Sequence, residues 1–132
     1  MNLEFEIEAK PSHVHVSCSG NFDLEGIKEM FRAVLAAADR HHLPRAFVDA
    51  RPLTGSASAV ERYGVGAFIS EQMLERKQAG TIRIGFVVDP ERFGDTVASN
   101  RRCTVRAGAD TKEIRDWLGI EPADGPDAND GK

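Results

Sequence analysis

The chain has 132 residues, of which 41% are hydrophobic and 29% charged, and a formal net charge of −4. This fits one ordinary globular domain, and the apolar residues recur periodically rather than in a run of about 18 or more, so no membrane span is predicted. Residues 121 to 132 carry −3 of the charge, which leaves only −1 for the rest. A nearly neutral body without a basic stripe argues against nucleic-acid binding.

The first ten residues, MNLEFEIEAK, alternate acidic and apolar side chains. They lack the basic flank and apolar block of a signal peptide, so we expect a cytoplasmic location. The two cysteines, Cys18 and Cys103, form no CxxC pair and lie far apart in the sequence. They predict small core residues rather than a disulfide framework or a zinc site.

Two short segments at the N-terminus have the period-2 pattern of strands. Residues 3 to 8 alternate apolar side chains with glutamates, and residues 13 to 18 alternate histidine or serine with valine or cysteine. The intervening KPSH breaks the pattern, which predicts an antiparallel hairpin. Its solvated face is expected to carry the acids opposite His13 and His15.

A long helix follows, because apolar side chains recur at helical spacing from Leu24 to Ala38. Asp23 is placed as its N-cap, and the helix must end before Pro44. The next segment, RAFVDA at residues 45 to 50, is a short apolar run typical of a central strand covered on both faces.

A second helix begins at Ser58, which forms a capping box with Glu61 three residues later. The helix is predicted to end near Gly80. Its expected apolar stripe consists of Val60, Tyr63, Ala67, Phe68 and Leu74.

The remaining elements are shorter. Residues 81 to 86 alternate as a strand, residues 91 to 100 predict a short, weak helix, and CTVRAG at 103 to 108 predicts a last strand. Asp110 then starts a terminal helix through a second capping pattern. The apolar face of that helix is formed by Ile114, Trp117 and Leu118.

The predicted order is β-β-α-β-α-β-α-β-α, an α/β fold. Strands joined through helices should be parallel with right-handed crossovers, so we expect a mixed, mostly parallel five-stranded sheet with helices packed mainly on one face. Residues 1 to 120 form a single domain in this interpretation. Residues 121 to 132 are rich in Pro, Gly and Asp and are expected to be a disordered acidic tail.

Several motifs, taken in this order, resemble a known family. VHVSCSGNFDLEGIKEMF is similar to the strand, Gly-x-hydrophobic-Asp turn and first helix of STAS domains. AFVDAR, IRIGFVV and TKEIRDWLG resemble the bacterial branch that is similar to anti-sigma-factor antagonists. The resemblance spans residues 1 to 120 and implies a β-α superhelix with a mixed sheet.

The resemblance also implies functions. STAS domains bind protein partners such as kinase-like anti-sigma factors, often under control of phosphorylation at the start of the second helix, and some bind nucleotides. Related lipid carriers of the CRAL-TRIO type hold apolar ligands. The STAS phosphorylation motif resembles Asp-Ser-Ser-Gly, whereas this chain has LTGSAS in that place. The candidate partner or phosphorylation loop comprises Asp49, Arg51, Thr54, Ser56 and Ser58.

Each of these residues also has a purely structural interpretation. Ser58 would cap the helix and Ser56 would be a loop residue. Asp49 follows a central strand, where α/β sheets place their ligands, but it can equally accept hydrogen bonds from the loop or pair with Arg51. The segment RPLTGS matches neither the P-loop nor the hydrolase elbow pattern.

Three functions remain as hypotheses. The first is a non-catalytic regulatory module that binds a protein partner. The second is a carrier of a lipid-like or other small apolar ligand, with a pocket near Tyr63, Phe68, Phe86 and Phe93. The third is a small enzyme, for which no acid-base pair can be assembled. No cofactor or metal is expected, because the histidine pair of the hairpin would need a third ligand.

Overall fold

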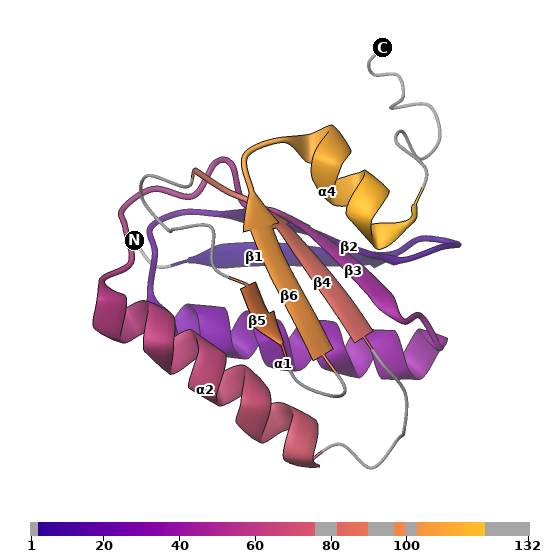
Figure 1. Ribbon diagram of the computed structural model, residues 1–132, viewed down its shortest axis with the longest axis horizontal. Helices are drawn as coiled ribbons and strands as arrows, with labels where there is room; N and C mark the ends of the chain where they lie inside the picture. The colour runs from indigo at the N-terminus through magenta and orange to yellow at the C-terminus, as the bar shows by residue number, and fades with distance from the viewer. Residues whose placement is uncertain (1–2, 76–81, 90–96, 100–102, 121–132) are drawn as a thin grey trace.

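The computed structural model of the chain describes residues 3–75, 82–89, 97–99 and 103–120. They form one six-stranded sheet in the order β1-β2-β3-β4-β6-β5, with helices on both faces (Figure 1). The α/β class and the mixed sheet are therefore confirmed. No helix among these residues has both the length and the apolar character needed to cross a membrane.

The sheet combines a hairpin with a parallel centre. β1 (Glu4–Ala9) pairs antiparallel with β2 (Val14–Ser19), so that Glu8 lies opposite His15. The parallel centre then runs from β2 through β3 (Arg45–Asp49) and β4 (Ile82–Val87) to β6 (Cys103–Gly108).

All five predicted strands are present, and the sheet has one more. β5 (Val97–Ser99) pairs antiparallel with β6 at the edge of the sheet. The prediction of a helix over residues 91 to 100 is therefore wrong for residues 97 to 99, because pairing with a neighbouring strand outweighs a weak local helical pattern. The rest of that prediction, like the tail at 121 to 132, lies outside the described residues.

Two long helices cover one face of the sheet and a short one covers the other (Figure 1). α1 (Leu24–His41) and α2 (Ala59–Glu75) lie on the first face and α4 (Thr111–Leu118) on the second. The alternation along β3 explains both layers, since Val48 belongs to the larger core under α1 and Phe47 to the smaller core under α4. This agrees with the prediction that helices pack mainly on one face.

α1 follows its prediction closely. Asp23 occupies the N-cap, although its side chain makes no capping hydrogen bond. His42 ends the helix in the left-handed conformation, with φ of 57°, before Pro44. The side chains of one stripe are buried: Ile27, Met30, Phe31, Val34, Leu35 and Ala38.

The hairpin departs from its prediction on the histidine face. His13 is completely buried, and the ring of His15 stacks on Phe47, with ring centroids 5.6 Å apart. We expected this face to be solvated, and for these residues that is wrong. β2 is an inner strand, and Arg115 of α4 lies over Phe47, so the second layer covers this part of the sheet.

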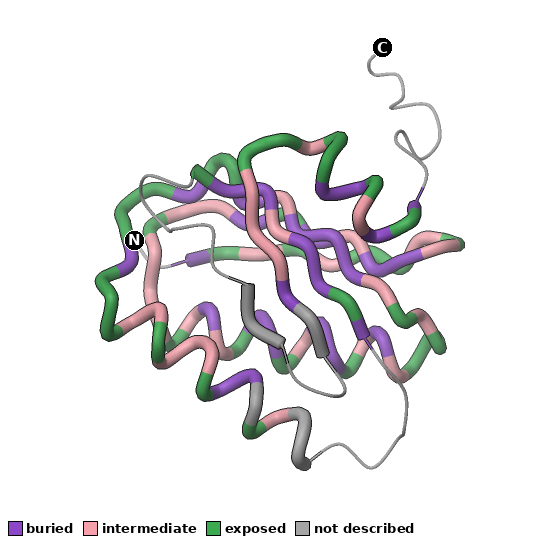
Figure 2. The backbone as a smooth tube through the Cα atoms, in the orientation of Figure 1, coloured by how far each residue is buried: buried purple, intermediate pink, exposed green. Residues whose placement is uncertain are grey.

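α2 also differs from its expected orientation. Val60, Tyr63 and Ala67 are exposed, whereas Phe68 and Ile69 are buried. Figure 2 shows exposed and intermediate positions over much of α2. The sequence pattern therefore identified the helix but assigned part of its apolar surface to the wrong side. α2 carries apolar residues around much of its circumference, so periodicity alone does not select the buried face.

Candidate binding site at the start of α2

The candidate site is the connection between β3 and α2, residues 50 to 58. Its first residue bonds to β4, with 2.9 Å between the Ala50 nitrogen and the Val87 oxygen. The middle of the connection is hydrogen-bonded to the turn before α1. The Thr54 nitrogen donates to the Gly20 oxygen at 2.8 Å, and the Thr54 oxygen accepts from the Phe22 nitrogen at 2.9 Å. The connection is thus tied to the sheet and to a segment distant in sequence.

Asp49 and Arg51 form an ion pair at the base of this connection. Arg51 donates from Nε and Nη2 to the two carboxylate oxygens of Asp49, at 2.8 and 2.7 Å. Partial burial opposes ionisation of Asp49, but these hydrogen bonds and the positive charge of Arg51 hold the pKa of its carboxyl below the usual value. The predicted pairing of Asp49 with Arg51 is therefore confirmed, and it leaves Asp49 poorly placed to act as a base.

The hydroxyl groups of the loop have unequal roles. Ser58 and Glu61 form both halves of the capping box, at 2.9 and 3.1 Å, which confirms the predicted helix start. Thr54 Oγ1 donates to the Gly20 oxygen at 2.9 Å. Ser56 lies exposed in the loop. A phosphate on Ser58 would place its negative charge beside the Glu61 carboxylate. Ser56 is not part of the capping box.

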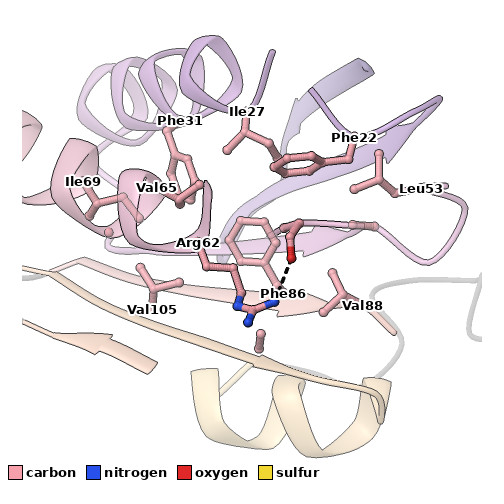
Figure 3. A pocket seen from close by; sticks show the side chains of 14 residues that line it. Phe22, Ile27, Phe31, Leu53, Arg62, Val65, Ile69, Phe86, Val88 and Val105 are labelled. Atoms are coloured by element: carbon pink, nitrogen blue, oxygen red, sulfur yellow. Dashed lines mark hydrogen bonds between the residues drawn. The ribbon is translucent and has the colours of Figure 1, made fainter. Parts of the chain in front are cut away.

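A cavity of about 120 Å³ lies beside this connection. Its wall is formed by α1, α2, the strands β4 and β6, and the loop itself (Figure 3). Ala50, Leu53 and Ala57 contribute the loop side of the wall. Among the described residues that line it, almost all are apolar and Arg62 alone is charged.

Of the four residues predicted to line an apolar pocket, the three that the structure describes are not brought together. Phe86 lines the cavity, but Tyr63 is 79% exposed. Phe68 is buried against α1, where Arg32 lies over its ring at 5.0 Å from the centroid. Phe93 lies outside the described residues.

Sequence reasoning missed three residues that shape the cavity, namely Phe22, Leu53 and Arg62. Phe22 and Leu53 sit in turns, where an apolar side chain outside any periodic segment could have indicated a covered loop. Arg62 is one charged residue on a helix, for which the sequence carries no distinguishing signal.

Beside the loop, α2 presents two large apolar side chains to solvent. Val60 is 80% exposed and Tyr63 79% exposed, and both lie within the first two turns of the helix. They are the only large hydrophobic residues described that are exposed. We call residues 51 to 58 together with Val60 and Tyr63 the α2 surface.

Other reactive groups do not assemble around the connection. Burial raises the pKa of the Cys18 thiol to about 11, so the thiol is protonated at neutral pH. No three metal-binding side chains come together among the described residues. No model of a known protein family matches the sequence, and no curated protein matches it.

Proposed function

We propose that the chain is a non-catalytic interaction module of the STAS type, and that it binds a protein partner through the α2 surface. The exposure of Val60 and Tyr63 carries this proposal. Tyrosine is enriched at the energetic centres of protein interfaces, because it buries a large area at a small cost in side-chain entropy. The element order and the motifs that resemble STAS domains support the same assignment.

The connection before α2 suits such a role because it is held in place. Its hydrogen bonds to the turn before α1, the Asp49 ion pair and the Ser58 capping box fix the backbone on which the exposed side chains stand. A surface that is ordered before binding loses less conformational entropy when the partner binds. The polar side chains of the loop therefore have a structural purpose that assists recognition.

The test compares proteins captured from the source cells by the wild-type chain and by a Val60→Ser, Tyr63→Ser double variant. Both positions are exposed, so we expect the variant to fold with nearly unchanged stability. Loss of interface anchors typically costs about 1–2 kcal/mol or more, and a specific partner should bind at least about tenfold more weakly.

The matched control is Arg40→Ala, an exposed change at the far end of α1. A partner retained by this control but lost by the double variant is then purified, and its affinity for all three proteins is measured by calorimetry. Equal affinities for the wild type and the double variant would contradict the proposal.

A second function, the carriage of a small apolar ligand, is favoured by the cavity beside the same loop. Drug-sized sites usually have volumes of about 300–1,000 Å³, so a cavity of about 120 Å³ suits a much smaller molecule. Its walls come from two helices and two strands that the fold holds together.

A further inference from the structure

In the part of the chain that the structure describes, the cavity combines an apolar lining with one cation, Arg62, at its wall. Phe31 from α1, Ile69 from α2, and Phe86 and Val105 from the sheet enclose it. A cavity of about 150 Å³ in another protein holds a benzene molecule, so this one, at about 120 Å³, has room for a slightly smaller apolar body of about five carbon atoms. Such a body would gain free energy by leaving water.

Arg62 contributes the positive charge of this wall. Its Nη1 donates to the Ala57 oxygen at 2.7 Å, and Figure 3 shows the guanidinium reaching from α2 alongside Phe86. Within the described part of the chain this is its one side-chain interaction, and no carboxylate pairs with it. A guanidinium has five N–H donors, so several are available to a ligand.

We infer that the cavity binds a small carboxylic acid with an apolar body, whose carboxylate pairs with Arg62. The geometry of a guanidinium matches a carboxylate, to which it can donate two parallel hydrogen bonds. A single cation balances a single negative charge, whereas a phosphate monoester carries about −1.5 to −2 at pH 7. The carboxylate therefore suits this wall better. This inference rests on the second function proposed above and is independent of the partner surface.

The test uses hexanoate and hexan-1-ol as probes, which share the six-carbon chain and differ in charge. Binding of each to the full chain at pH 7 is measured by calorimetry and by NMR shift changes of the amides that line the cavity. We expect hexanoate to bind more tightly than the alcohol. Hydrogen bonds to charged groups contribute about 1.5–3 kcal/mol, so Arg62→Met should weaken hexanoate binding about tenfold or more and leave the alcohol unchanged.

Three further variants separate the contributions. Arg62→Lys keeps the charge and should restore part of the hexanoate affinity. Arg40→Met removes a charge at the C-terminal end of α1 and should bind hexanoate like the wild type. Ala107→Leu adds three carbons to the cavity wall and should abolish binding of both probes, with its folding checked by circular dichroism.

The outcomes distinguish the two ideas. If both probes bind equally, or if Arg62→Met binds hexanoate like the wild type, the carboxylate assignment is wrong while carriage of an apolar ligand stands. If neither probe shifts the cavity amides of the wild-type protein, both are overturned. If Ala107→Leu folds and still binds hexanoate, the ligand lies outside this cavity.

Discussion

At the scale of single residues, His15 packs on an aromatic ring and lies close to several charged groups. Its ring is half-buried, stacks on Phe47, and lies in the field of Arg115 and Lys10. Burial is the main cause that lowers its pKa below the usual 6.5, and the two cations add to it. Asp49 and Glu8 oppose this shift but do not outweigh it.

This shift predicts a pH-dependent stability. Because the pKa of His15 is lower in the folded state, the unfolded state takes up the proton first as the pH falls below about 6.5. The free energy of unfolding should therefore decrease from pH 7 downward, until the pH passes the folded-state pKa. His15→Gln removes this contribution, and urea unfolding between pH 7.5 and pH 5 should show a shallower loss of stability. His41→Gln, which removes an exposed imidazole, serves as the control, and identical slopes for wild type and His15→Gln would contradict the assignment.

At the scale of elements, the contact between α4 and β4 depends on a position without a side chain. Gly85 lies beneath α4, and a Cβ atom there would lie 2.5 Å from Ile114 Cγ2 and 3.1 Å from Leu118 Cδ1. Neighbouring Phe47 already fills the space on the next strand. The helix can therefore approach the sheet only because this position is glycine.

We expect Gly85→Ala to destabilise the protein by about 1–3 kcal/mol, the usual cost of overpacking a core. The matched control is Gly66→Ala in α2, where a Cβ atom would meet nothing within 4 Å. Alanine in a helix interior is favoured over glycine by about 0.5–1 kcal/mol, so this variant should be slightly more stable than the wild type. Urea unfolding measures both, and a Gly85→Ala protein as stable as the wild type would show that α4 adjusts without cost.

At the scale of the whole molecule, the two faces of the sheet are unequal. The larger core lies under the 18 residues of α1 and the 17 of α2, and the smaller one lies under the eight residues of α4. A helix of this length is marginal by itself and depends on its packing. The two layers should therefore differ in local stability.

Native-state hydrogen exchange should detect this difference. Amides of α4 are expected to exchange through a partial opening of lower free energy than the amides of β3 and β4, which lie at the centre of the sheet. The prediction fails if α4 and the central strands exchange with the same free energy at every denaturant concentration.

Local chemistry accounts for what the sequence could predict. The hairpin strands and β4 follow from alternation, and β3 follows from its short apolar run. The start of α2 follows from the Ser58 and Glu61 pair, and the start of α4 from Asp110, which accepts from the nitrogens of Lys112 and Glu113. The ion pair of Asp49 with Arg51 could be predicted from two residues separated by a single position at the end of a strand. These features depend on residues close together in the chain.

The remaining features depend on contacts between distant segments. The exposure of Tyr63 follows from which side of α2 meets α1, and the cover over His15 follows from α4, which lies about a hundred residues later. Phe22, Arg62 and Ala107 all line the cavity but lie far apart in the sequence. Periodicity predicts which apolar residues lie on one face of an element, but it does not predict which residues of other elements they contact.

The acidic alternation of β1 has a consequence for self-association. β1 is an edge strand, and its Glu4, Glu6 and Glu8 are all exposed. A second copy that paired with this edge would place its own row of carboxylates beside the first, and like charges on adjacent strands repel. The unpaired backbone groups of an edge strand favour aggregation, and in β1 the charges on alternate residues oppose it at neutral pH. In acid the glutamates are protonated and this protection is lost.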